Sequence, residues 1–489
     1  MEIEYKDISF GVRKVYEDQF AVETRVDASE RGGVSKTLSV EAEAKVSGVE
    51  LLPGEARISG KVNYRLLYLD GQEKLCGLDY FKDFEYVLMG EDIRADEKQS
   101  LDLSVIEATG RAAGSGIELS AIVGAQLTAY GDREERAVAA VRGAEIKEES
   151  FSSQKLTAKR EFLIELEKEE SAGANIKKIV LFDAAAAIRE ASVAGGVSKV
   201  AGEALANVVY VTEEGETVER SFAFPFSREE ETDAEKARFD LSVKNARVVL
   251  SGDEENSLIE IEAVLALSVC EFADRDISVV TDAYSSESET EETKTNLCLR
   301  PFLSQAFFSS PLSGVIEAEG VRRVVTVRPG GSAIANVAVL ENAVKADGVV
   351  SFTAVYETEE GYSSRESELP FSFEFPLVGA ELFKSAEASI TVLSVVSRLV
   401  GGGVEISAET SVAVSLFGEE EVSFLSDLSE CGPREEEEAG VTVYFADKGE
   451  DLWSIAKAMR TAPSALVNAN PFLNAPLEEA KKVLIFRGK

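Results

Sequence analysis

The amino-acid sequence predicts a mostly β protein: three tandem antiparallel β-sandwich-like repeats followed by a small α+β module of βααβ order. Three observations predict this fold class. One phrase recurs three times at the spacing of a whole domain, apolar and polar residues alternate with a period of two in each copy, and helical periodicity is scarce before residue 447.

Glycine and tyrosine anchor the recurring phrase. It reads ISGKVNYRLLYLDG, VAGEALANVVYVTEEG and ADGVVSFTAVYETEEG, and its glycines, 142 and 146 residues apart, are Gly60, Gly202 and Gly348. The same two spacings separate Tyr68, Tyr210 and Tyr356. Such a period corresponds to a domain, because solenoid units repeat at about 20–50 residues. We therefore expect the three tyrosines to lie on equivalent strands.

Period-two alternation predicts strands within each copy. In the first copy Val62, Tyr64 and Leu66 face one side, while Lys61 and Arg65 face the other. This pattern is typical of half-buried antiparallel strands, and each copy has room for about seven or eight of them.

Each copy also contains an aromatic middle segment. The three segments read LDYFKDFEYVL, RSFAFPFS and LPFSFEFP. Proline among aromatic residues fits an edge strand that packs its rings into a core, and an aromatic ligand groove is the alternative.

The repeat spacing and the composition place the domain boundaries. A Gly-, Pro- and Glu-rich stretch with four consecutive glutamates, Glu435–Glu438, is typical of an extended acidic linker. The expected units are three repeats at 1–148, 149–294 and 295–429, the linker at 430–440, and the last module at 441–489.

Charge and composition exclude several functions. Residues 441–489 carry seven basic and five acidic residues, which leaves 44 basic and 84 acidic residues in 1–440. Such an acidic body repels nucleic acid, so we expect no nucleic-acid partner. The chain has no histidine and its four cysteines are far apart, so we expect no metal, no cofactor, no catalytic residues and reduced thiols.

The beginning of the sequence bears on localisation. MEIEYKDISFGVRKVYEDQF lacks the basic and apolar regions of a secretory signal, and no stretch approaches the ~18 apolar residues of a membrane span. We therefore expect a cytoplasmic protein without membrane insertion.

The last module is predicted in four elements. VTVYFA, from Val441, is a strand; LWSIAKAM is a helix opened by the acidic turn Gly449-Glu450-Asp451; Pro463 begins a second helix; and KVLIFR is a closing strand. The buried stripe of the first helix is expected at Leu452, Ile455, Ala456 and Met459.

This module resembles a LysM domain. The family pattern G-D-T-L-x-x-I-A corresponds to Gly449–Ala456, and L-x-x-x-N-P to Leu466–Pro471. The resemblance implies a groove between Gly449–Leu452 and Asn470–Leu473, where LysM domains bind glycans. The family's Asp-Thr is Glu450-Asp451 here, and its P-G-Q-K-L turn is replaced by EAKKV. Because these changes alter the groove and no export signal is visible, we expect the module to prefer protein to glycan.

The three repeats resemble the SPOCS domain of spore-coat proteins. The family phrases K-V-x-G-x-V-x-F-x-V-L-Y and V-x-L-S-V-x-V are echoed at Ile58–Tyr68, Val200–Tyr210 and Ile261–Val269. Tandem SPOCS domains, an acidic tether and a LysM domain resemble the SipL-type coat morphogenetic proteins. That resemblance implies a spore-coat assembly protein whose LysM domain binds the coat-basement ATPase at the forespore surface, in the mother-cell cytoplasm.

Three functions remain open at this point. The first is a non-enzymatic spore-envelope scaffold with a protein-docking head; the second is a peptidoglycan-binding cell-wall protein, which needs export; the third is an enzyme within the repeats.

Three residues of the last module also leave two interpretations open. Trp453 lies off the buried stripe, so it is either a packing residue or an interface anchor. Arg460 is either a solvated helix-end cation or a partner contact, and Phe472 belongs to the core or the interface. The candidate partner- or glycan-binding residues are Val441, Gly449, Glu450, Asp451, Trp453, Arg460, Asn470, Pro471 and Phe472.

Overall fold

The first third of the chain forms two three-stranded antiparallel sheets. The computed structural model describes residues 1–489 except 253–256, 434–439, 472, 474–475 and 488–489. The sheet orders are β1-β6-β5 and β2-β3-β4. The strands are β1 (Glu2–Asp27), β2 (Lys36–Leu52), β3 (Glu55–Leu69), β4 (Leu75–Met89), β5 (Lys98–Ala113) and β6 (Gly116–Arg142), with a 3-10 turn η1 (Ser29–Arg31). One core joins both sheets, with Ile58 and Tyr64 from β3 and Ile117 and Val123 from β6.

The second third repeats this sheet order. Its sheets are β7-β12-β11 and β8-β9-β10. Tyr210 of β9 and Ile259 of β12 meet in the core between them. The strands are β7 (Glu145–Ser171), β8 (Ile176–Ala194), β9 (Val197–Thr212), β10 (Thr217–Glu231), β11 (Lys236–Gly252) and β12 (Ser257–Tyr284).

The last third has the same two sheets and one additional pair of strands. The sheets are β14-β19-β18 and β15-β16-β17, and β13 pairs with β20. The two long strands are interrupted here at 300–301 and 418–419, which gives eight strands where each earlier third has six within the described residues. The strands are β13 (Ser288–Leu299), β14 (Phe302–Glu317), β15 (Arg323–Val339), β16 (Ala343–Thr358), β17 (Gly361–Pro376), β18 (Ser385–Val400), β19 (Gly403–Phe417) and β20 (Glu420–Pro433), with η2 (Ala380–Leu382).

The turns between the thirds lie a few residues from the expected boundaries. The boundaries at 148/149, 294/295 and 429/430 fall inside β7, β13 and β20, and the chain turns at 143–144 and 285–287. The four glutamates of the expected linker, Glu435–Glu438, lie outside the described residues.

The C-terminal head has two strands and two short helices. Its elements are β21 (Gly440–Ala446), α1 (Leu452–Met459), α2 (Pro463–Ala469) and β22 (Lys481–Arg487), and β21 pairs antiparallel with β22. Ile455, Ala456 and Met459 are buried as the helical stripe predicts, while Leu452 is half-buried. Across the described part of the chain, no helix combines the length and apolar character needed to cross a membrane.

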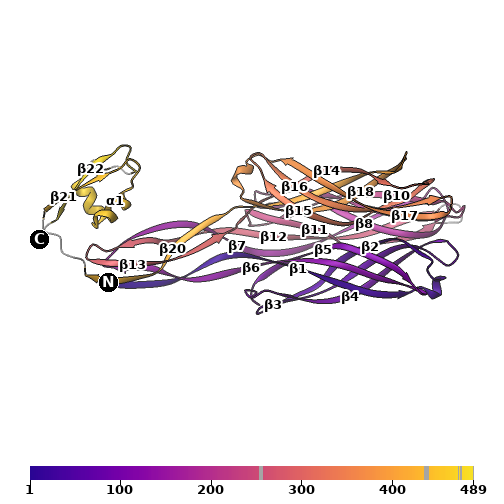
Figure 1. Ribbon diagram of the computed structural model, residues 1–489, viewed down its shortest axis with the longest axis horizontal. Helices are drawn as coiled ribbons and strands as arrows, with labels where there is room; N and C mark the ends of the chain where they lie inside the picture. The colour runs from indigo at the N-terminus through magenta and orange to yellow at the C-terminus, as the bar shows by residue number, and fades with distance from the viewer. Residues whose placement is uncertain (253–256, 434–439, 472, 474–475, 488–489) are drawn as a thin grey trace.

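A narrow stalk extends from the three-stranded sheets toward the head (Figure 1). The stalk consists of the far ends of β1, β6, β7 and β12 together with β13 and β20, which extend beyond those sheets. Its apolar interior is drawn from all three thirds and includes Ile8, Phe10, Ala137, Ile277, Val279, Leu297, Leu299, Val422 and Phe424. The head lies at the far end of this stalk (Figure 1).

The three thirds pack around a common line with approximately threefold arrangement. Residues at matching repeat positions meet there in one cluster: Leu67 of β3, Val209 of β9 and Val355 of β16. Because this side of each strand is covered by the neighbouring thirds, both faces of β3 are buried near its end. Tyr64 is fully buried on one face and Leu67 on the other. The expectation of half-buried strands is therefore wrong at this position.

A buried ion cluster lies on the same line. The guanidinium of Arg328 donates from Nε to Glu41 Oε1 at 2.7 Å, and its Nη2 lies 2.5 Å from Asp183 Oδ1 and its Nη1 3.6 Å from Glu219 Oε1. The Arg328 side chain is 2% exposed. Glu41, Asp183 and Arg328 occupy matching positions, 142 and 145 residues apart. One cation thus pairs with two carboxylates, one from each of the other thirds.

Each recurring glycine leaves room for a phenylalanine ring from the neighbouring strand to pack over its Cα. Tyr68, Tyr210 and Tyr356 lie on the middle strands β3, β9 and β16, and the aromatic segments form the outer strands β4, β10 and β17, as expected. A Cβ atom at each repeat glycine would lie 2.5–2.6 Å from a phenylalanine ring carbon and even closer to a backbone carbonyl oxygen. The glycine–phenylalanine pairs are Gly60 with Phe84, Gly202 with Phe226, and Gly348 with Phe371.

We predict that Gly348→Ala lowers the stability of the third set of sheets by about 1–3 kcal/mol, because the added methyl overlaps the Phe371 ring and a β15 carbonyl. Gly401→Ala is the matched control, since nothing lies within 4 Å of its Cβ position. Chemical unfolding midpoints of the two variants should differ, and equal midpoints would contradict this account of the repeat glycine.

We also predict that Arg328→Met destabilises the protein by about 3–5 kcal/mol, because it removes the cation paired with the buried carboxylates of Glu41 and Asp183 and leaves them only the electrostatic interaction with Arg65. The triple variant Glu41→Leu/Asp183→Leu/Arg328→Leu removes all three charges and should recover most of that loss. Calorimetric unfolding of both variants tests this; a triple variant no more stable than Arg328→Met would show that the charges are not the cause.

Candidate docking site

The acidic turn that opens helix α1 is held together by its own charged residues. Gly449 adopts a left-handed φ of 92°, and its N–H donates to the carbonyl of Leu477 at 2.8 Å. Asp451 is the N-cap and accepts from the backbone N–H of Ser454 at 2.7 Å. Glu450 accepts from the hydroxyl of Tyr444 and from the N–H of Asp447, both at 3.1 Å. These carboxylates are therefore engaged in local structure.

Asn470 joins the end of α2 to strand β22. Its amide donates to the carbonyls of Leu466 at 2.9 Å and Leu484 at 2.7 Å, and its Oδ1 accepts from the N–H of Leu484 at 2.8 Å. Asn470 is fully buried. Its side chain thus serves the fold of the head, while Pro471 next to it is exposed and Phe472 lies outside the described residues.

Trp453 packs against the end of the stalk. Its indole N–H donates to Oδ2 of Asp282 at 2.7 Å, and its ring meets Tyr284 edge-to-face with centroids 4.9 Å apart. The hydroxyl of Tyr284 donates to the carbonyl of Thr461 at 2.8 Å. Asp282 and Tyr284 are the last residues of β12, so a strand end from the second third receives the helix of the head.

Two cations on the same side of the helix complete this contact. Nζ of Lys457 donates to Asp282 at 2.5 Å and to Glu292 of β13 at 2.8 Å. The guanidinium of Arg460 binds both carboxylate oxygens of Glu289, through Nη2 at 2.6 Å and through Nη1. We name Trp453, Lys457 and Arg460 the docking face, and Asp282, Tyr284, Glu289 and Glu292 the stalk tip.

The protonation states at the stalk tip suit this contact. Burial would raise the pKa of Asp282, but hydrogen bonds from Lys457 and Trp453 outweigh burial and hold that pKa below its ordinary value. Burial would likewise lower the pKa of Lys457, and the hydrogen bonds to Asp282 and Glu292 raise it instead. Both groups are therefore charged at neutral pH, and the contact is an ion pair supported by an aromatic pair.

A second surface of the head lies along strand β21. Val441, Val443 and Phe445 alternate along this strand and are 57%, 44% and 69% exposed. Lys482 lies over the Phe445 ring at 5.3 Å. We name these three apolar residues the outer strand surface.

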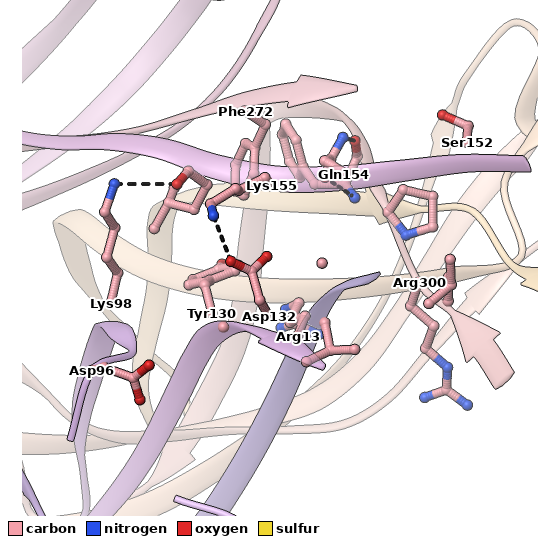
Figure 2. Close-up of a pocket in the computed structure, with 17 residues that line it drawn as sticks. Arg13, Asp96, Lys98, Tyr130, Asp132, Ser152, Gln154, Lys155, Phe272 and Arg300 are labelled. Carbon is pink, nitrogen blue, oxygen red and sulfur yellow. Dashed lines mark hydrogen bonds and ion pairs between the residues drawn. The ribbon is translucent and has the colours of Figure 1, made fainter. Parts of the chain in front are cut away.

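A cavity of about 190 Å³ is lined by residues of β1, β5, β6, β7, β12 and β13 and by residues 300–302 (Figure 2). Three of its polar side chains are bound to neighbouring groups of the chain: Lys155 to Asp132 at 2.5 Å, Lys98 to the carbonyl of Thr157 at 2.5 Å, and Gln154 to the backbone of Phe302 at 2.8 Å. These residues come from all three thirds. The cavity is therefore a junction between them.

The structure divides the predicted site residues into three groups. Gly449, Glu450, Asp451 and Asn470 build the head, Trp453 and Arg460 contact the stalk tip, and Val441 and Pro471 are exposed. The sequence left Arg460 open between a solvated helix-end cation and a partner contact; in the structure its guanidinium is partly exposed and pairs with Glu289 of the same chain.

Sequence reasoning missed Lys457 and the whole stalk tip. The spacing of Trp453, Lys457 and Arg460, at i, i+4 and i+7, marks one helix face and could have identified Lys457. The acidic run Ser285–Glu292 has the composition of a spacer between repeats, but its last five residues begin strand β13.

Among the described residues, no group of three or more Cys, Asp or Glu side chains is arranged to hold a metal ion, and the four cysteines are free thiols. Comparison of the chain with protein-family models, with curated proteins and with solved structures finds no match.

We predict that Asn470→Ala destabilises the head by about 2–3 kcal/mol, because it leaves the buried N–H and C=O of Leu484 without their partner. Asn468→Ala, at an exposed position two residues earlier, is the control. Hydrogen exchange of residues 441–485 in the full chain measures the effect. If Asn470→Ala leaves the hydrogen-exchange protection of the head unchanged, Asn470 is not needed for its fold and becomes again a candidate for contacting a ligand.

Proposed function

We propose that this protein is a non-enzymatic scaffold of the spore envelope whose C-terminal head docks a protein partner, the coat-basement ATPase at the forespore surface. The proposal combines the family resemblance with the order of parts along the molecule. A large acidic body, a narrow stalk and a basic-leaning head at its end suit a carrier that presents a binding module at a distance.

The contact between the head and the stalk tip carries this proposal. The docking face binds a protein surface made of carboxylates and one tyrosine, through an indole N–H, an ammonium and a guanidinium. An aromatic anchor flanked by cations is typical of protein interfaces. We therefore expect the partner to present an acidic surface with an exposed aromatic ring.

We also propose that the three thirds are copies of one SPOCS-like β-sandwich domain and that the head is a LysM domain. Supporting this are the common sheet order and the three matching glycine–phenylalanine pairs. The βααβ order of the head and the capping role of Asp451 are in keeping with a LysM-type turn.

Peptidoglycan binding is the alternative function. It would use the groove between Gly449–Leu452 and Asn470–Leu473. In this chain Glu450 and Asp451 bind local backbone and side-chain groups, and Asn470 is fully buried, so fewer polar groups remain to hydrogen-bond a sugar. We assign no catalytic residue, metal or cofactor to the protein, and place it in the mother-cell cytoplasm.

Binding of the full-length chain to the purified ATPase and to peptidoglycan sacculi tests the function. Trp453→Glu should weaken ATPase binding by about 2 kcal/mol or more, about 30-fold in Kd, because it removes the aromatic anchor. Phe445→Glu changes an exposed residue of the same head outside the docking face and should leave binding unchanged. Circular dichroism establishes that both variants are folded.

The possible outcomes are distinct. Loss of binding in Phe445→Glu with retention in Trp453→Glu would move the docking site to the outer strand surface. If the chain binds sacculi saturably and does not bind the ATPase, the proposed scaffold function is wrong and the alternative, a peptidoglycan-binding cell-wall protein, is supported.

A further inference from the structure

We infer that the stalk tip is an internal competitor for the docking face: it covers Trp453 within the same molecule, and a protein partner reaches that face only after the head leaves the tip. The part of this inference that concerns a partner rests on the proposed function. The closure itself rests on contacts within the chain.

Each side chain of the docking face has a partner at the stalk tip. The three side chains, one helical turn apart from each other, each bind a residue of the stalk tip: Trp453 binds Asp282, Lys457 binds Asp282 and Glu292, and Arg460 binds Glu289. A second protein cannot use the same hydrogen-bonding groups and the same face of the indole while these bonds persist. Closed and partner-bound states therefore exclude each other.

The closed state is reversible because its ion pairs are partly exposed. The side chains of Lys457 and Arg460 are 39% and 32% exposed, and Glu289 is 50% exposed. Ion pairs with such exposure contribute little each and are weakened by salt. Covalent attachment offsets the weakness of these ion pairs, because a head joined to the stalk by a short segment experiences a high effective concentration of the stalk tip.

The tip also presents the chemistry expected of the partner. Three carboxylates and one tyrosine, Asp282, Glu289, Glu292 and Tyr284, surround the indole and the two cations. Only open molecules can bind the partner, so the apparent affinity for the partner is reduced in proportion to the fraction of molecules that are open. Weakening the contact between the stalk tip and the docking face should therefore strengthen partner binding.

Trp453 is the sole tryptophan of the chain, so its fluorescence in the full-length protein reports closure directly. The variants are Asp282→Ala and, on the neighbouring strand, Glu289→Ala/Glu292→Ala. The matched control is Glu405→Ala, which removes a carboxylate paired with Arg398 on the exposed body surface. Acrylamide quenching and the emission wavelength are measured at several protein concentrations and at about 0.01 and about 1 M salt, where the Debye length falls from about 30 to about 3 Å.

We expect both tip variants to raise the open fraction at least about tenfold, with stronger quenching and emission at longer wavelength, because each loses charge-assisted hydrogen bonds. High salt should shift the wild type in the same direction, and Glu405→Ala should behave as wild type. Indole shielding that is unchanged in both tip variants would overturn the inference. A wild-type signal that depends on protein concentration would also overturn it, because docking would then occur between molecules.

The ATPase supplies the second readout. Tip variants with a freed indole should bind it more tightly than the wild type, by the factor that the fluorescence gives for opening. Equal affinities would show that the tip does not compete, which overturns the inference. If the indole is freed and neither protein binds the ATPase, closure stands and the proposed partner is wrong.

Discussion

The arrangement of this molecule depends on one buried guanidinium. Arg328 binds Glu41 and Asp183 and lies near Glu219, so one side chain ties together residues from all three thirds of the chain. Three identical acidic residues at these matching positions would repel one another in a low-dielectric interior. The third copy must therefore differ from the other two at this position. A buried ion pair adds little net stability, but it penalises arrangements that leave any of these charges unpaired.

The stalk follows from that arrangement. Long strands of each third continue beyond the paired sheets, and their apolar faces are covered where Phe10, Val279 and Phe424 meet from three separate parts of the chain. Because the three thirds pack around a common line, the far ends of their long strands meet in one stalk. The end of β12 and the start of β13 then form a surface that carries Asp282, Tyr284, Glu289 and Glu292, and this surface receives the head.

The charged turn of the head positions its first helix. Glu450 and Asp451 satisfy backbone and hydroxyl donors at the start of α1, which orients the helix and thereby the docking face. Trp453, Lys457 and Arg460 all contact the stalk tip from this helix and its end. Under the proposed function, a head closed on its own stalk stays inactive until a partner competes for that face.

The sequence by itself determined the mostly β character, the strands that carry Tyr68, Tyr210 and Tyr356, and the buried stripe of α1, because period-two and period-3.6 patterns are local. It placed Trp453 off the buried stripe of α1 but left open whether the indole packs or anchors an interface. Only the tertiary structure decided that Leu67 is buried on the second face of its strand, that Arg328 pairs with Glu41 across 287 residues, and that Asp282 receives Trp453. These contacts join segments that are far apart in the chain. A local sequence pattern shows whether a residue is apolar or charged, but it does not show which distant residue that residue contacts.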